Sequence, residues 1–176
     1  MSRGHVIVDG YNLLHAHPAY ASAVDSDIDG ARARLVADLA GFAQGGPRTI
    51  VVFDGGANPD SDGSPHHVGG LTVIFSPHQT SADQVIEGLA RRFRQRGEPT
   101  LVVTSDTATR QTVVGGTVSI LSSARFAAEL AAEGAGRLEA ARAPRTVPLS
   151  RRIAPDVSDN LARWARGGGP EGREGD

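Results

Sequence analysis

The chain has 176 residues, enough for one domain with a buried core, and its 39% hydrophobic and 22% charged residues are typical of a folded globular protein. It contains no cysteine, which excludes disulfides and thiolate zinc sites, and no apolar run near the roughly 20 residues of a membrane span. The net charge of -2 excludes a generic polyanion binder. We expect a cytoplasmic protein, because the first predicted strand leaves no room for a signal peptide.

Strand and helix signals alternate along the first half of the chain. A short apolar run predicts a strand over residues 5–8, followed by a loop that contains Gly10 and Pro18. Apolar residues at helical spacing predict a helix over 28–42, and a second strand covers 49–53. The stretch 55–70 is rich in Gly, Pro, Asp, Ser and His, so we expect an exposed loop there.

The alternation continues in the second half and then weakens. Strands are predicted over 71–75, 100–104 and 118–121. Helices are predicted after a cap at Ser81, over 106–114, and after Ser122 or Ser123. Parallel strands separated by helices predict an α/β sheet covered on both faces over residues 1–138. We expect an Arg-rich strap and helix over 139–166 to pack on this domain and a disordered tail over 167–176.

Acidic side chains recur where the predicted strands end. Asp9, Asp54 and Asp106 each follow a strand, and Asp83 lies just before a helix. Because right-handed crossovers place the carboxyl ends of parallel strands at one edge of the sheet, we expect these acids to meet there. Glu87 follows Asp83 by four residues and therefore shares its helix face.

A group of carboxylates at one edge is unstable unless a cation neutralises it. A hard divalent metal prefers carboxylate oxygens, and it can activate water and neutralise charge during phosphodiester hydrolysis. The alternative for any single Asp is that it only caps a turn after its strand. The recurrence of the pattern favours a metal-dependent nuclease.

Five segments together resemble a known family. Residues 6–14 read VIVDGYNLL, 51–55 VVFDG, 80–87 TSADQVIE, 102–106 VVTSD and 122–126 SSARF. In this order they are similar to the motifs of the YacP-like NYN family, bacterial relatives of PIN-domain ribonucleases. The resemblance covers roughly residues 5–134. One departure is Thr107-Ala108-Thr109, where members often carry an aromatic or charged residue.

The resemblance implies a PIN-like three-layer α/β/α sandwich with a central, mainly parallel sheet, and an endoribonuclease that depends on Mg²⁺ or Mn²⁺. By motif position, the implied metal ligands are Asp9, Asp83 and Asp106, with Glu87 as a further candidate. Asp54 is implied to add negative charge or to hold a metal through water. The implied supporting and substrate-binding residues are Asn12, Thr104 and Ser105.

RNA is the implied substrate, and a family member is implied to cleave mRNA on the translating ribosome. Arg91 belongs to a group of four Arg between residues 91 and 96 that could guide an RNA backbone or simply form a solvated face. Trp164 lies between Arg163 and Arg166, so it could stack on a base or dock a last helix on the domain. The sequence specifies neither a cleavage sequence nor an oligomeric state.

Two other functions fit parts of the pattern. One is a non-catalytic RNA- or ribosome-binding module that keeps the PIN shape, and the other is a metal-dependent phosphatase. The absence of Lys counts against phosphatase schemes that pair a nucleophilic Asp with a Lys. His66 and His67, with acids nearby, could form a metal site, but adjacent His residues in a Gly/Ser loop rarely point the same way. We interpret them as part of a solvated loop.

Overall fold

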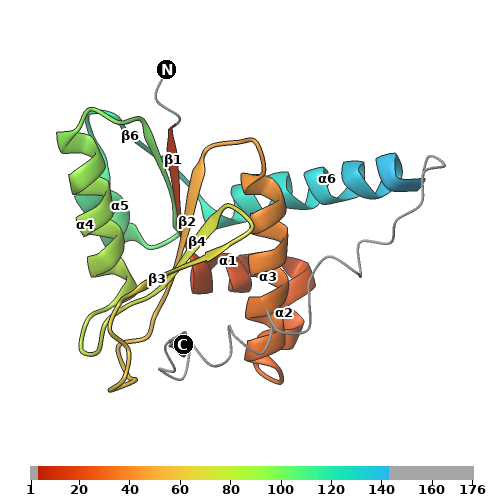
Figure 1. Ribbon diagram of the computed structural model, residues 1–176, viewed down its shortest axis with the longest axis horizontal. Coiled ribbons are helices and arrows are strands. Elements are labelled where there is room, and N and C mark those ends of the chain that lie inside the picture. Colours follow the sequence, from red (N-terminus) through yellow and green to blue (C-terminus); the bar gives the residue numbers. More distant parts are fainter. Residues whose placement is uncertain (1–3, 143–176) are drawn as a thin grey trace, which may run out of the picture.

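The computed structural model describes residues 4–142, so the predictions for 143–166, including Trp164, and for the tail 167–176 lie outside the described residues. The strands of the described chain form one sheet with the order β3-β4-β2-β1-β5-β6 (Figure 1). Their bounds are β1 His5–Asp9, β2 Arg48–Phe53, β3 Pro65–Val68, β4 Leu71–Phe75, β5 Thr100–Val103 and β6 Val118–Leu121.

The sheet is parallel except at one edge. β1 is central and pairs in parallel with β2 and β5, while β4 and β6 extend the parallel order outward. Only β3, among the described strands, runs antiparallel, against β4. In register, Asp9 lies opposite Val52 of β2, and Val8 lies opposite Val103 of β5. The carboxyl ends of β1, β2 and β5 therefore lie side by side.

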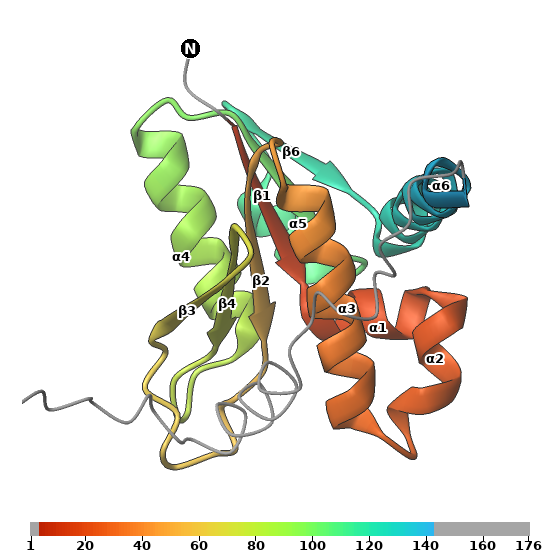
Figure 2. The same cartoon turned by 45° about the vertical axis from the view of Figure 1, so that its right-hand side comes forward.

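Helices cover both faces of the sheet. They are α1 Gly10–Ala16, α2 Pro18–Val24, α3 Ile28–Ala43, α4 Ala82–Gln95, α5 Thr107–Val113 and α6 Ser123–Arg142. One apolar core joins the sheet to α1, α2, α3 and α6, and a second joins the opposite face to α4 and α5. Figure 2 shows α4 on one side of the sheet and α1, α2 and α3 on the other. The three-layer, mainly parallel architecture predicted from the sequence is confirmed.

The predicted parallel strands are present within a residue or two of their expected bounds. Every residue of β1 is buried, because helices pack on both of its faces. A strand with two buried faces needs a continuous apolar run rather than an alternating one, which is why the strand signals were clear. The predicted helix over 28–42 corresponds to α3, and the cap predicted at Ser81 opens α4.

The loop predicted after residue 9 is wrong, because this segment forms α1 and α2. Asp9 caps α1 by accepting a hydrogen bond from the backbone N–H of Asn12. His17 ends α1 and caps α2, and Pro18 occupies the first turn of α2. Proline suits that position because its missing N–H would have no partner there. Gly10 and Pro18 therefore belong to helix starts, although both resemble loop signals.

The exposed loop predicted over 55–70 is wrong in its last part. Residues 65–68 form β3, and His66 and His67 lie opposite Val73 and Thr72 of β4. Neighbouring residues of a strand point to opposite faces, so these two imidazoles diverge. The His67 ring makes a 3.2 Å hydrogen bond with the Thr72 hydroxyl. Gly69 and Gly70, both with positive φ, form the tight turn into β4.

Within residues 4–142, no helix combines the length and apolar character that a membrane crossing requires.

Candidate active site

The predicted acids lie where the parallel strands end. Asp9 is the last residue of β1, Asp54 follows β2, and Asp106 follows β5 and caps α5. Asp83 lies in the first turn of α4. In sheets of this kind, ligands bind outside the carboxyl ends of the strands. The fold therefore brings acids that are distant in sequence to the edge of the sheet where a substrate is expected.

Asp9 is held by Asn12 through two hydrogen bonds. The backbone N–H of Asn12 donates to Asp9 Oδ1 at 3.1 Å, and its side-chain amide donates to Oδ2 at 2.7 Å. The amide oxygen of Asn12 accepts a hydrogen bond from the backbone N–H of Ser105 at 3.1 Å. Asn12 thus ties the end of β1 to the segment after β5 and fixes the orientation of the Asp9 carboxylate.

The close fit after Asp9 requires a glycine. A Cβ atom at Gly10 would lie 2.4 Å from the ring of Phe53, a buried residue at the end of β2. Any larger residue would push α1 away from the sheet. Because α1 carries Asn12, such a shift would also disturb the hydrogen bonds to Asp9.

The Asp9 carboxyl is buried beside two other acids. Only 4% of the residue is exposed, and this burial is the main cause that raises the pKa of Asp9 to about 6. The negative charges of Asp83 and Asp106 raise it further, against the hydrogen bonds from Asn12 that lower it. Asp83 and Asp106 therefore lie close enough to disfavour the charged form of Asp9, which is the condition that a bound cation relieves.

Thr109 connects the other two acids. Its hydroxyl donates to Asp83 Oδ1 at 2.7 Å, and its backbone N–H donates to Asp106 Oδ2 at 2.7 Å. Thr109 is 1% exposed, whereas Asp83 and Asp106 are half-buried, so the two hydrogen bonds are partly shielded from water. The bonds from Thr109 hold the pKa of Asp106 below its usual range. One residue of α5 therefore positions one carboxylate from α4 and one from the end of β5.

The start of α4, which places Asp83, is well defined. The Ser81 hydroxyl accepts a hydrogen bond from the backbone N–H of Gln84, and the Gln84 side chain accepts one from the backbone N–H of Ser81. This reciprocal capping box fixes the first turn of the helix. Just before it, Gln79 has a φ of 63°, a left-handed conformation that is uncommon outside glycine, and its N–H donates to Gly56.

Thr104 and Ser105 support this edge through their hydroxyls. Thr104 is fully buried, and its hydroxyl accepts a hydrogen bond from the backbone N–H of Asp106 at 3.1 Å. The Ser105 hydroxyl accepts one from the backbone N–H of Ser123 at 3.2 Å, at the start of α6. Thr104 is enclosed, whereas Ser105 is exposed beside Asn12 in a hollow of about 380 Å³.

Asp54 and Glu87 are held differently from the other acids. Asp54 is exposed, and its Oδ1 accepts the backbone N–H of Gly56 in a local turn at 2.9 Å. Burial is the main cause that raises the pKa of Tyr11, and the negative charge of Asp54 raises it further. Glu87 is half-buried one turn along α4 from Asp83, and Arg91 is exposed a further turn along. The structure thus groups Asp9 with Asp83 and Asp106, and leaves Asp54 and Glu87 at the margin.

The acid group fits a hard divalent cation in donor type and charge. Carboxylate oxygens are the preferred ligands of Mg²⁺ and Mn²⁺, and burial beside two other acids raises the pKa of Asp9, so its charged form is costly without a cation. Within residues 4–142, no three His, Cys, Asp or Glu side chains already stand in a metal-holding arrangement. Each of the three carboxylates accepts hydrogen bonds from the protein instead.

Thr109 is the site residue that sequence reasoning missed. In the sequence, Thr107-Ala108-Thr109 stands out only as a departure from the family pattern. The sequence did contain a signal for it. Asp106 is a good helix N-cap residue, and an N-cap side chain accepts a hydrogen bond from the backbone N–H three residues later, which here belongs to Thr109. The additional bond from the Thr109 hydroxyl to Asp83 depends on the packing of α5 against α4, which the local sequence does not encode.

A mainly parallel sheet with helices on both faces and carboxylates at its strand ends agrees with a PIN-like fold. A family model described as the YacP-like NYN domain matches residues 6–166. The chain belongs to the YacP-like NYN domain family.

Solved structures agree with this membership. A crystal structure of Rae1 (YacP) from Bacillus subtilis is 24% identical and has a TM-score of 0.61, with 92% of this chain and 94% of that chain covered. A second structure, of a point mutant of Rae1, is 23% identical with a TM-score of 0.59, covering 90% and 98%. At this level of identity the likeness shows the fold. A comparison with curated proteins gave no match.

Proposed function

We propose that this protein is an endoribonuclease that requires Mg²⁺ or Mn²⁺ and uses Asp9, Asp83 and Asp106 as its metal-binding carboxylates. Membership of the family supports a ribonuclease-type activity. The observation that carries the proposal is the buried Asp9 carboxyl, whose pKa is raised to about 6 by burial and by the charges of the other two acids. The ionised form of the Asp9 carboxyl is destabilised by burial and by the neighbouring acids, and a bound cation would stabilise it.

Each residue at the edge of the sheet has a distinct role in this proposal. Asp9, Asp83 and Asp106 would hold the cation, which when bound supplies an activated water and neutralises charge on the scissile phosphate. Asn12 and Thr109 orient the carboxylates through the hydrogen bonds described above. Asp54 and Glu87 would add negative potential that favours a cation at this edge.

The substrate would enter along the exposed side of this edge. Asp83, Glu87 and Arg91 are spaced at four-residue intervals, so they follow one face of α4. Arg91 lies about 12 Å along the helix from Asp83 at 1.5 Å per residue. We assign Arg91 to a contact with an RNA phosphate, because an exposed guanidinium can bind phosphate oxygens through two parallel hydrogen bonds. Asn12, which donates to Asp9, lines the hollow together with Ser105.

We further propose that mRNA engaged with the ribosome is the substrate in the cell, and this part rests on the family resemblance alone. A comparison of naked RNA with the same RNA during translation, both with purified protein and Mn²⁺, tests it. Cleavage that is faster on the translated RNA supports the ribosomal context. Equal cleavage of both forms would remove that part and leave the nuclease proposal intact.

The central test is metal-dependent cleavage of a single-stranded RNA. The wild type is expected to cut internally with Mn²⁺ or Mg²⁺ and to stop when EDTA is added, and Asp9→Asn is expected to be inactive. Asp25→Asn is a matched control, because Asp25 is an exposed acid at the end of α2. If RNA binds but is never cut under any metal condition, the protein is an RNA-binding module that retains the nuclease fold.

A further inference from the structure

A group of arginines lies on the face of the sheet that α4 and α5 cover. Its members are Arg91, Arg92, Arg94 and Arg96, in the last turns of α4 and at its end, and Arg110 on α5. All are exposed except Arg94, which is half-buried. Residues 88–97 and 107–116 contain no acid, so the group forms a locally basic surface on a chain whose net charge is -2.

The guanidinium groups of this basic surface have no carboxylate partner within residues 4–142. Glu87 and Arg91 have the four-residue spacing of a helical ion pair, yet the two side chains do not form one. A guanidinium that is not paired with a carboxylate can bind phosphate oxygens through its planar set of donors. Cations in the last turn of a helix also stabilise the helix through its dipole, so a test must separate that role from binding.

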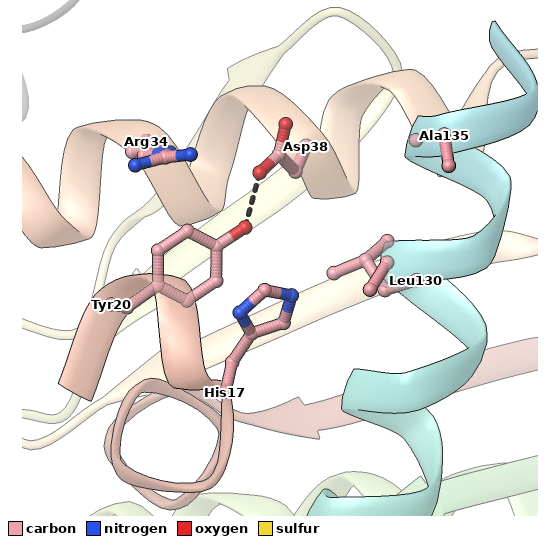
Figure 3. A pocket seen from close by; sticks show the side chains of 8 residues that line it. His17, Tyr20, Arg34, Asp38, Leu130 and Ala135 are labelled. Atoms are coloured by element: carbon pink, nitrogen blue, oxygen red, sulfur yellow. Dashed lines mark hydrogen bonds between the residues drawn. The ribbon is translucent and has the colours of Figure 1, made fainter. Parts of the chain in front are cut away.

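Charges of both signs lie on the opposite face of the sheet. A cavity of about 300 Å³ lies there between the α1–α2 junction, α3 and α6 (Figure 3). Its His17 and Tyr20 rings are buried against each other, and the guanidinium of Arg34 lies over the Tyr20 ring, 5.6 Å from its centroid. Asp38 accepts a hydrogen bond from the Tyr20 hydroxyl, as Figure 3 shows. The charges of Arg34 and Asp38 oppose each other, so this cavity has no net attraction for a polyanion.

The arginines of α4 lie on two different sides of the helix. At 3.6 residues per turn, Arg94 lies within roughly 20° of Asp83 around the helix axis, and Arg91 lies within roughly 80° of it. Arg92 and Arg96 lie about 180° and about 140° from Asp83, on the other side. Among the arginines of α4, Arg91 and Arg94 therefore share the side of the helix that carries the acid.

α5 lies along this same side of α4. Near the acids, the Thr109 hydroxyl of α5 donates to Asp83. At the other end, the aliphatic part of Arg94 lies against the turn after α5, because a Cβ atom at Gly116 would be 3.3 Å from Cδ of Arg94. The two helices therefore run side by side away from the acids. Arg110 is exposed on α5, one turn after the N-cap of that helix.

The arginines on this side lie at increasing distances from the acids. At 1.5 Å per residue, Arg110 is about 6 Å along α5 from Asp106, and Arg91 and Arg94 are about 12 Å and about 16 Å along α4 from Asp83. A single strand that stacks at roughly 3.4 Å per nucleotide covers the longest of these distances with about five nucleotides. Cations spaced in this way suit the repeating phosphates of a strand whose scissile phosphate lies at the acids.

We propose that Arg110, Arg91 and Arg94 form a phosphate-binding track, along which the backbone of a single-stranded RNA continues from the acids for about five nucleotides between α4 and α5. The proposal deepens the proposed function and rests on it for the identity of the polymer as RNA. It adds Arg94 and Arg110 to the contact assigned to Arg91. Arg92 and Arg96, on the other side of α4, lie outside the track. Because the track binds phosphates, it does not read the base sequence.

The salt dependence of RNA binding tests the track without cleavage. Full-length protein in EDTA is titrated into a fluorescently labelled oligouridine of about 12 nucleotides at several salt concentrations, and affinity is read by anisotropy. On a single strand, the slope of log affinity against log salt concentration is about 0.7 for each phosphate neutralised. We expect the double variant Arg91→Gln/Arg94→Gln to lower this slope by about 1.4 and to bind about tenfold more weakly at moderate salt. The matched control Arg92→Gln/Arg96→Gln, which removes the same charge from the same helix, should keep the wild-type slope.

Equal slopes in the two double variants, or no measurable binding of the RNA by the wild type, would overturn the proposal. Thermal unfolding separates binding from helix stabilisation. Both double variants remove two charges near the C-terminus of α4, so their Tm values are expected to fall by similar small amounts. Arg110→Gln tests the part of the track on α5, and its slope should be about 0.7 below that of the wild type. An unchanged slope in Arg110→Gln would remove Arg110 from the track.

A cleavage assay separates the track from the nuclease proposal. With Mn²⁺ and a long single-stranded RNA, Arg91→Gln/Arg94→Gln should raise KM about tenfold, while Arg92→Gln/Arg96→Gln should stay within about twofold of the wild type. Cleavage by both double variants at the wild-type KM would remove the track and leave the nuclease. A slope that falls only in Arg91→Gln/Arg94→Gln, in a protein that never cuts RNA, would remove the nuclease and leave the track.

Discussion

The acids at the strand ends and at the start of α4 form two groups that are held differently in the fold. Asp9, Asp83 and Asp106 accept hydrogen bonds from buried or half-buried donors, and the charges of Asp83 and Asp106 act on Asp9. Asp54 is exposed in a local turn, and Glu87 lies one helical turn beyond Asp83. Both groups satisfy the same sequence rule, an acid at the edge of the sheet. The difference shows that fixed orientation, more than position alone, distinguishes a candidate metal ligand.

The largest effect is expected from removing a charge in the first group. Asp83→Asn should reduce metal-dependent RNA cleavage by about 1,000-fold, because the loss of a direct ligand exceeds the 10- to 100-fold typical of an outer partner. The amide can still accept the hydrogen bond from the Thr109 hydroxyl, so the fold should be unchanged. Cleavage rates at saturating Mn²⁺, with circular dichroism as the folding control, measure this. An active Asp83→Asn protein would contradict the proposal that the first group binds the metal directly and the second does not.

The raised pKa of Asp9 predicts a pH-dependent stability. The folded state holds the Asp9 proton with a pKa of about 6 against an ordinary 3.8, so this group's contribution to stability is complete below pH 4 and is lost as pH rises to 6. The lost contribution is about 3 kcal/mol at 1.36 kcal/mol per pKa unit. In EDTA, the free energy of unfolding of Asp9→Asn, relative to that of the wild type, should therefore rise by about 3 kcal/mol between pH 4 and pH 7.

Urea unfolding of the two proteins across this pH range measures the difference between them. Other titrating groups are common to both proteins and cancel in the comparison. Parallel pH profiles for the wild type and Asp9→Asn would show that the Asp9 charge is not strained in the metal-free fold.

Thr109 should have the next largest effect, although it contacts no substrate. Thr109→Val removes the hydroxyl bond to Asp83 and keeps the shape and the backbone bond to Asp106. We expect a 10- to 100-fold fall in cleavage and a matching rise in the Mn²⁺ concentration for half-maximal activity. Thr109→Ser should restore most of both, because it returns the hydroxyl. A Thr109→Ser protein as weak as Thr109→Val would indicate that packing, not the hydrogen bond, is what matters.

The smallest effects are expected in the second group. Asp54→Asn should lower cleavage by about tenfold or less, and Glu87→Gln should lower it by about threefold or less, because exposed charges act on the site through water. Both are measured in the same cleavage assay at moderate and high salt, and the effects should shrink as salt rises. Losses as large as that of Asp83→Asn would place these acids among the direct metal ligands.

The parallel strands and the acids at their ends were accessible from the sequence for a physical reason. β1 and β2 are buried on both faces, so their apolar runs are continuous, and each is followed by an acid. Because the strands are parallel, the acids that follow them become neighbours at one edge of the sheet. The pairing of Asp9 with Asn12 was also within reach, because both belong to one helix start.

The rest depended on packing between distant segments. α1 and α2 are short and carry Gly10 and Pro18, which resemble loop signals until the caps at Asp9 and His17 are seen. The bond from Thr109 to Asp83 joins residues 26 positions apart on α5 and α4. The cavity at His17 requires α6 to cross α3, which no local pattern specifies.

Mn²⁺ binding in the absence of RNA tests the central claim most directly. Free Mn²⁺ is measured by electron paramagnetic resonance during titration of the wild type, Asp106→Asn and Asp54→Asn at pH 7. We expect Asp106→Asn to bind at least about tenfold more weakly than the wild type and Asp54→Asn to bind nearly as tightly. Wild-type affinity in Asp106→Asn, or a complete loss in Asp54→Asn alone, would contradict the assignment of the metal to Asp9, Asp83 and Asp106.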